Sequence, residues 1–499
     1  MRNCKNVPVQ RLLWLLALML SSSVLSVSTA PGQTRVAQKT LRMPASADSG
    51  LPPTLADTGA FADLRTLRPS AGILPFQINV PLWADEAHKT RWFSLSETNL
   101  TIGFNREGKW SFPSGTTWIK LFELDLTNGV PSSARRLETR FLVRTTEGVY
   151  GVTYRWDDSQ TNATLVPAEG LDEKFTVHEG GTVRTQTWHY PSRWECLRCH
   201  NPVAGYALGF NTAQLNCDVD YGDGARNQIR ALSDAGFFAS PVTNLHTLPA
   251  LTAATNTAVS VEHRVRSYLA ANCVHCHQPG AECGQYGLQR SFDAQPSTPL
   301  RVANLVNGLP VFGNFGESEN RIIKPDGPTQ SIMLRRVADL TPGIHMPPLA
   351  TSVLNTQAVQ LLTEWITNEL SGFQSYADWQ MNEFGQNFSN DAASAADPDH
   401  DGAPNYLEYL TGTNPHAAAG AWRISLRRTT RGMEVHFPRL ARMGFEVEWT
   451  GDIANPASWQ PLDVPGNRPF FAATPQEAVV EDAEVSAIPR FYRVRVYEP

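Results

Sequence analysis

The sequence predicts a multidomain α+β protein, and three observations support this prediction. The chain has 499 residues, which is more than a single hydrophobic core usually supports. Stretches before residue 185 and after residue 419 alternate apolar and polar side chains with the period of two that is typical of strands. Between them, apolar side chains recur at helical spacing. We therefore expect, in chain order, an N-terminal antiparallel β-domain, a mainly helical region, a short acidic loop and a C-terminal β-module.

The N-terminus has the layout of a secretory signal peptide. Basic residues precede an apolar run at residues 12–20, and Ser28, Thr29 and Ala30 provide small side chains at its end. The run is shorter than the roughly 20 apolar residues that a membrane span requires. We therefore expect residues 1–30 to be removed on export, which leaves a periplasmic, extracellular or cell-surface bacterial protein without a membrane span.

The bulk composition is that of an ordinary folded protein, with 41% hydrophobic and 18% charged residues. A formal net charge of −6 leaves no basic footprint, so we expect no nucleic-acid partner. Residues 31–59 are rich in Pro, Ala, Ser and Thr and are expected to form a flexible linker. Residues 60–185 are expected to form the β-rich N-terminal domain, because "TWIKLFELDL" and "GVYGVTYRW" alternate with period two.

Two motifs of the form C-x-x-C-H lie in the middle of the chain, in "WECLRCHNP" and "NCVHCHQPG". Paired cysteines alone could hold zinc or form disulfides, but a histidine follows both pairs although His makes up only 12 of 499 residues. Cysteines three apart on a helical turn can both reach the vinyl groups of one porphyrin, and the adjacent histidine can bind its iron. We therefore predict two covalently bound haem c groups. The haem-binding residues are Cys196, Cys199, His200, Cys273, Cys276 and His277, of which His200 and His277 bind iron.

The second motif lies in a cytochrome c-like frame at residues 256–373. Apolar side chains at helical spacing precede the motif, and an amphipathic helix is predicted to begin at Asn355 or Thr356. Between them, "TPGIHMPPLA" presents Met346 from a stretch that prolines stiffen. We predict Met346 as the second ligand of this haem iron, although most methionines are simply core residues.

The first haem segment, residues 186–255, lacks a comparable second ligand. No methionine occurs between Met43 and Met333, so this iron is expected to take a histidine or to keep an open position. Either arrangement favours a lower potential than that of a Met-ligated haem. The histidines considered are His189, His246, His178, His88 and His263, and the sequence does not choose among them.

Longer blocks of sequence resemble a known group of proteins. The runs "TWHYPSRWECLRCHNPVAGYALGFNTAQLN", "RSYLAANCVHCHQPG" and "MPPL", with "ILPFQINVPLWADEAHKTRWFSL" upstream, are similar to exported bacterial dihaem c-type cytochromes of largely unassigned role. The resemblance covers roughly residues 60 to 372. It implies electron transfer by two haems and redox partners such as sugar- or alcohol-oxidising enzymes.

An acidic stretch, "DPDHDGAPNYLE", lies in the segment 374–418 and has the spacing of an EF-hand loop. The alternative is a simple acidic turn. We predict a calcium site in a single-loop repeat, because no good helix precedes the loop. Its expected ligands are Asp397, Asp399, Asp401, the Ala403 carbonyl, Asn405 and Glu408.

Residues 419–499 return to alternating strands and are expected to form a small C-terminal β-module. It resembles modules appended to many exported bacterial proteins, so attachment to the cell surface and a passive stabilising role both stay open. Cys217 and Cys283 could pair as a disulfide in an oxidising compartment.

The leading functional hypothesis is an exported dihaem c-type cytochrome that passes electrons from a donor dehydrogenase to a downstream acceptor. The alternative is a dihaem peroxidase in which one haem keeps an open sixth position. A third hypothesis is a binding or anchoring protein whose haems act as sensors.

Overall fold

The computed structural model describes residues 35–36, 39–48, 50–222, 224–283, 292–310, 313–349, 351–385, 389–484 and 489–498. The chain forms two compact units. The N-terminal unit comprises Met1–Val242 and Pro347–Leu354, and the C-terminal unit comprises Thr243–Met346 and Asn355–Pro499. The signal peptide expected at residues 1–30 lies outside the described residues.

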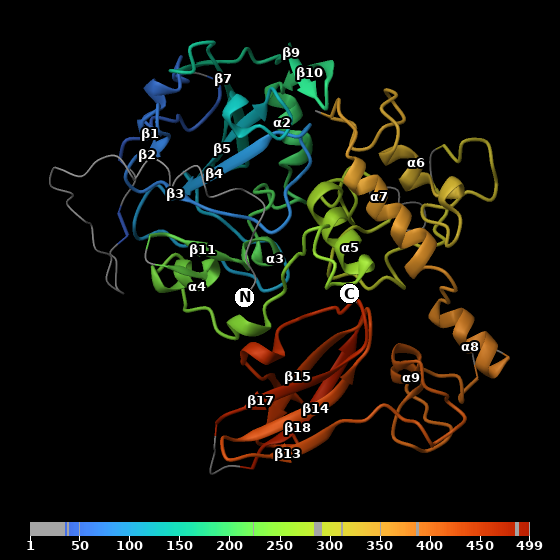
Figure 1. Cartoon of the computed structure of the whole chain (residues 1–499). Coiled ribbons are helices and arrows are strands. Elements are labelled where there is room, and N and C mark those ends of the chain that lie inside the picture. The colour runs from blue at the N-terminus through green and yellow to red at the C-terminus, as the bar shows by residue number, and fades with distance from the viewer. Residues whose placement is uncertain are drawn as a thin grey trace. The chain divides into compact units, whose positions relative to one another are not determined.

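The largest element of the N-terminal unit is a six-stranded antiparallel sheet (Figure 1). Its strands, in spatial order, are β3 (Leu74–Pro75), β4 (His88–Ser94), β5 (Thr117–Asp125), β6 (Ala134–Arg144), β7 (Val149–Trp156) and β8 (Ala163–Leu165). One face carries Trp92, Ile119 and Phe141 into a hydrophobic core, which also buries Leu55. Leu55 belongs to the linker expected at residues 31–59, so this part of the linker is packed in the core.

The opposite face of the sheet is more polar and lies next to smaller elements. A hairpin of β9 (Leu171–Glu179) and β10 (Thr182–Tyr190) shares a second core with Phe122 through Phe175 and Trp188. The other elements of the unit are β1 (Phe61–Asp63), β2 (Arg68–Pro69), α2 (Arg193–Cys199), α3 (Thr212–Leu215), β11 (Asp218–Asp220), β12 (Ala225–Asn227) and α4 (Gln228–Asp234).

The C-terminal unit combines short helices with two small antiparallel sheets. Its helices are α5 (Val261–Asn272), α6 (Ile332–Val337), α7 (Thr356–Glu364), the π-helical turn η5 (Trp365–Glu369), α8 (Tyr376–Phe384) and α9 (Asn405–Thr411). One sheet has the order β13 (Ser425–Arg428), β14 (Met433–Arg439), β17 (Gln476–Asp482), and the other β16 (Gln460–Pro461), β15 (Gly444–Thr450), β18 (Phe491–Tyr497). Short 3₁₀ turns in the two units are η1 (Ala56–Thr58), η2 (Pro131–Ser133), η3 (Leu245–Thr247), η4 (Pro328–Gln330), η6 (Pro456–Ser458) and η7 (Pro465–Asn467).

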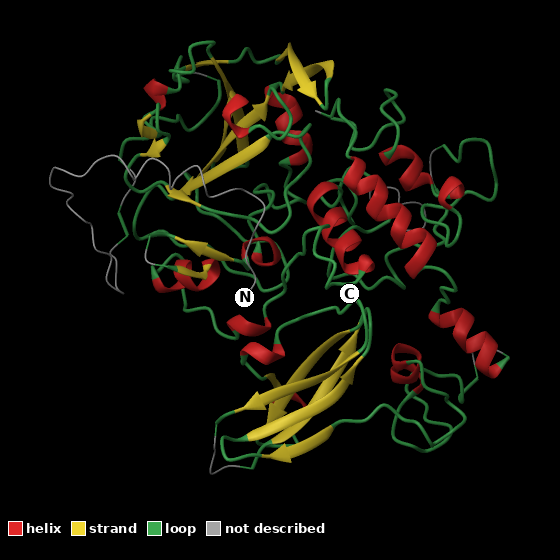
Figure 2. Ribbon diagram, viewed as in Figure 1, coloured by secondary structure: helices red, strands yellow, loops and turns green. Residues whose placement is uncertain are grey.

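The fold class expected from the sequence is wrong, because the haem region at residues 186–373 is not mainly helical. No α-helix in the described part of the chain is longer than the 12 residues of α5, and loops connect the helices (Figure 2). Asn304 and Asn307 adopt positive φ angles of 52° and 57°, which a continuing α-helix does not allow. Helical spacing of apolar residues therefore overestimated helix length in a segment that turns break repeatedly.

No helix within the described ranges is both long and apolar enough to cross a bilayer.

Candidate functional site

The first C-x-x-C-H motif lies on the short helix α2 of the N-terminal unit. The Ser192 hydroxyl accepts the amide of Glu195, whose carboxylate accepts the amide of Ser192, and this capping box starts the helix next to the motif. Cys196 and Cys199 are therefore one helical turn apart, and neither forms a disulfide with another described residue. Burial raises the pKa of the Cys196 thiol to about 11, so this sulfur stays protonated in the folded chain.

His200, which ends α2, has an orientation that suits an iron ligand. Its Nδ1 lies 2.5 Å from the carbonyl oxygen of Tyr206. A carbonyl can only accept, so Nδ1 carries the proton and Nε2 carries the lone pair. This is the tautomer that a metal-ligating imidazole requires, with the second nitrogen held by a backbone carbonyl.

The helix α2 approaches strand β7 closely at Gly151. A Cβ atom added to Gly151 would lie 2.8 Å from the Cys196 Sγ atom, which is closer than such contacts allow. Only glycine therefore permits this approach. It places the first motif on the polar face of the sheet, because Gly151 pairs with Leu142 two residues from Arg140.

The second motif follows helix α5 in the C-terminal unit. The Ser260 hydroxyl caps the start of α5, and Cys273 ends it. The ring of His277 stacks on Phe292 with centroids 4.2 Å apart. Burial lowers the pKa of His277 to about 4, with His275 and Arg336 adding to the effect, so the imidazole is neutral.

Arg336 of helix α6 contacts the Met346 loop and acts electrostatically on the second motif. The Met346 amide donates to the Arg336 carbonyl at 3.1 Å, and the Arg336 guanidinium donates to the Ile344 carbonyl at 3.0 Å. The charge of Arg336 also acts on the pKa of His277. The same arginine thus holds the methionine loop and lies within electrostatic range of His277.

The segment directly after Met346, Pro347–Leu354, belongs to the N-terminal unit, and Asp85 holds it there. The buried Asp85 carboxylate accepts the amides of Ser352, at 2.8 and 3.0 Å, and Val353, at 3.0 Å, and the Ser352 hydroxyl at 2.8 Å. The Trp83 indole donates to the Val353 carbonyl at 3.0 Å. We call this set of bonds the Asp85 clamp. The sequence alone indicates a solvated turn residue at Asp85, and this interpretation is wrong because its side chain is buried; its positive φ of 49° is visible only in the structure.

The structure does not single out one of the five histidines considered as the expected second ligand at the first motif. Both ring nitrogens of His189 bind carboxylates, those of Asp172 at 2.7 Å and Glu195 at 3.0 Å. His88 contacts Asp125, and His263 stacks on Phe471 in the C-terminal unit. His178 lies exposed on β9, and His246 lies in η3 of the C-terminal unit.

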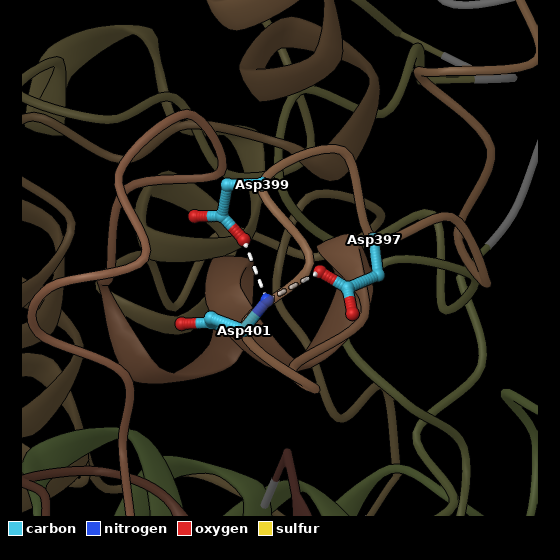
Figure 3. Close-up of side chains that lie close together, drawn as sticks. All are labelled: Asp397, Asp399 and Asp401. Atoms are coloured by element: carbon cyan, nitrogen blue, oxygen red, sulfur yellow. Dashed lines mark hydrogen bonds between the residues drawn. The ribbon is translucent and has the colours of Figure 1, made fainter.

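Three of the six calcium ligands predicted from the acidic stretch come together. Asp397, Asp399 and Asp401 offer carboxylate oxygens that lie within 4.8 Å of one another (Figure 3). The Asp401 amide donates to Asp397 and Asp399, each at 3.2 Å, and folds the loop around these oxygens. Asn405 and Glu408 begin and continue helix α9, and both are fully buried.

Several oxygens of this loop are buried without a hydrogen-bond donor among the described residues. These atoms are Asp399 Oδ2, Asp401 Oδ2, Asn405 Oδ1 and Glu408 Oε2. Burial and then the neighbouring Asp399 raise the pKa of Glu408. Burying negatively charged or polar oxygens without donors costs free energy, and a cation bound among them offsets this cost. The Ala403 amide donates to Asp401 at 2.7 Å, which holds the backbone at the predicted carbonyl ligand.

Comparisons with known proteins find no match. No family model, curated protein or solved structure is similar enough to identify the chain. Cys217 and Cys283, considered as a pair, form no disulfide with described residues and belong to different units.

Proposed function

We propose that the chain is an exported electron-transfer protein with two covalently attached haem c groups, one at each C-x-x-C-H motif. The observation that carries the proposal is the geometry of the first motif. Two thiols stand one helical turn apart, and the imidazole that follows them donates Nδ1–H to a backbone carbonyl. A disulfide or a four-cysteine zinc site leaves this histidine unused, whereas covalently attached haem requires one imidazole directly behind each cysteine pair.

The residues present fit two haem groups. Cys196 and Cys199 would attach the first haem and Cys273 and Cys276 the second, while the two trailing imidazoles would bind the irons. When bound, haem supplies one-electron chemistry between ferric and ferrous iron. The chain itself orients the ligands: the Tyr206 carbonyl fixes the tautomer of His200, and Arg336 holds the loop of Met346.

The resemblance to exported dihaem cytochromes supports a place between redox proteins. The donor would be a periplasmic or extracellular dehydrogenase, such as one that oxidises sugars or alcohols, and the acceptor a downstream electron carrier. Surface attachment would fall to the C-terminal module, whose β13 strand exposes Leu426.

Covalent haem content tests the proposal directly. The full chain is produced in a bacterium that matures c-type cytochromes, denatured and washed with acidified acetone. We expect a pyridine haemochrome spectrum with two haems per chain. In Cys199→Ser or Cys276→Ser, one haem should keep a single thioether and its band should shift. Colourless washed protein would contradict the proposal.

A dihaem peroxidase is the second candidate, favoured by one observation. His189 lies shortly before the first motif, but both its ring nitrogens already bind carboxylates. It therefore offers no lone pair to the first iron, which would leave the sixth position of that iron open. An iron with an open position would turn over peroxide with a reduced donor. Rapid turnover would replace the carrier proposal, and its absence would support it.

We also propose that the loop from Asp397 to Glu408 binds Ca²⁺. Three clustered carboxylates and the undonated oxygens of Asn405 and Glu408 make an all-oxygen site, which hard divalent cations prefer. The role is structural, because the loop leads directly into α9, which packs next to α8 through Tyr376 and Tyr409.

A further inference from the structure

Three cations stand side by side on the polar face of the N-terminal sheet. The antiparallel register pairs Arg91 of β4 with Lys120 of β5, and Lys120 with Arg140 of β6. Residues paired in this way point to the same face of a sheet. Like charges directly opposite each other destabilise a sheet, so a row of three requires a compensating anion.

The chain compensates this row only in part. Arg140 donates to the buried Glu138 carboxylate, with its Nε atom 2.8 Å from Oε2. Arg91 donates to the Lys89 carbonyl at 3.2 Å, which neutralises no charge. Lys120 makes no hydrogen bond or ion pair with any residue that the structure describes. Burial lowers the pKa of Lys120 to about 7, and Arg91 and Arg140 lower it further. The Glu138 carboxylate opposes this shift, but it is already hydrogen-bonded to Arg140.

The first C-x-x-C-H motif lies next to this row. Gly151, which contacts Cys196, pairs with Leu142, and Leu142 lies two residues from Arg140 on the same face. Cys199 also contributes to the electrostatic environment of Lys120 and of Arg140. A porphyrin attached at the two cysteine sulfurs would therefore start beside the row.

We propose that Arg91, Lys120 and Arg140 form a carboxylate-binding row that holds the propionates of the first haem, with Lys120 as the main contact. The inference rests on the proposed haem attachment at Cys196 and Cys199. Charge-assisted hydrogen bonds from ammonium and guanidinium groups to carboxylates are the strong ones in proteins, and they explain why the cations tolerate partial burial. Lys120 is a positioning residue, which also favours the reduced iron through its positive charge.

The test uses the matured dihaem protein and the variant Lys120→Met, which keeps the length of the side chain and removes its charge. We expect the midpoint potential of the first haem to fall while that of the second stays unchanged. Lys120→Arg keeps the charge and should restore the potential. Lys174→Met, which removes an exposed cation from β9, is the matched control and should leave both potentials unchanged.

The outcomes separate the sources of the carboxylate. Unchanged potentials in Lys120→Met, with two haems still attached and an unaltered melting temperature, would overturn the row while leaving the proposed function intact. If added succinate shifts the potential of the wild type and Lys120→Met abolishes that response, the row binds a free carboxylate and the propionate assignment is overturned. Absence of covalent haem would refute the proposed function and this assignment together.

Discussion

His189 and His200 show how hydrogen-bond partners decide what an imidazole can do. The two residues lie close in sequence, yet His200 donates Nδ1–H to a carbonyl whereas His189 bridges two carboxylates. A carbonyl partner leaves the other nitrogen its lone pair. Two carboxylate partners favour a proton on both nitrogens, so His189 acts as a cationic bridge between Asp172 and Glu195.

This bridge makes stability depend on pH. Burial opposes the charge of His189, but the hydrogen bonds to Glu195 and Asp172 raise its pKa above the ordinary 6.5. Protonated His189 therefore stabilises the folded state fully below about pH 6.5, and this contribution is lost as the pH rises through the folded-state pKa. We expect the melting temperature to fall as the pH rises from about 6.5 through the folded-state pKa. The loss in free energy of unfolding should be less than about 1 kcal/mol, because the Asp172 partner is exposed. In His189→Gln this part of the pH dependence should vanish; a variant that keeps it would contradict the bridge.

At the same scale, Met346→Ala tests the proposed ligation of the second haem iron by this methionine. Thioether ligation stabilises ferrous iron, so the substitution should lower one of the two midpoint potentials and abolish the near-infrared Fe–S(Met) band. Met381→Ala is the control, because Met381 is exposed on α8. A redox titration that Met346→Ala leaves unchanged would remove this methionine from the site.

At the scale of elements, short segments depend on tertiary contacts for their position. The helix α2 has seven residues, which is too short to be stable alone, so its capping box and its contact at Gly151 hold it in place. The described residues of the segment Pro347–Leu354 have no regular structure, and the segment depends on the Asp85 clamp.

Breaking the Asp85 clamp should therefore release the segment that follows Met346. Asp85→Ala leaves the partly buried amides of Ser352 and Val353 without their acceptor, while the Ser352 hydroxyl keeps the Thr187 carbonyl, and should cost about 1–3 kcal/mol. We expect faster hydrogen exchange at Ser352 and Val353 and a weaker Fe–S(Met) band. Asp85→Asn tolerates the positive φ and keeps one acceptor, so its effect should be smaller. Asp158→Ala, at an exposed carboxylate, is the control and should change neither measurement.

At the scale of the whole molecule, calcium bound at the proposed loop would stabilise the C-terminal unit. A cation that binds only the folded state raises stability by roughly 2.7 kcal/mol at a concentration 100-fold above its dissociation constant. The C-terminal unit also contains the second motif, so loss of the cation would affect the unit proposed to carry the second haem.

Chelation of calcium should accordingly lower the melting temperature of this unit, by roughly 5–10 °C at saturating initial Ca²⁺. Glu408→Gln should remove the response to calcium, because it takes away the buried carboxylate whose Oε2 has no donor. Glu477→Gln, at an exposed position on β17, should respond like the wild type. Identical melting curves with and without calcium in the wild type would contradict the site.

The sequence by itself determined the chemical groups that define the candidate sites. The spacing of C-x-x-C-H and of the acidic loop is local, and local geometry alone makes such residues neighbours. Helix extent was not determined in this way, because turns at residues such as Asn304 override the periodicity of apolar side chains. Only the tertiary structure decided that Lys120 stands between two cations, that Asp85 holds residues 352 and 353, and that His189 is bridged. These contacts join residues far apart in sequence, so strand register and packing create them, and no local pattern contains that information.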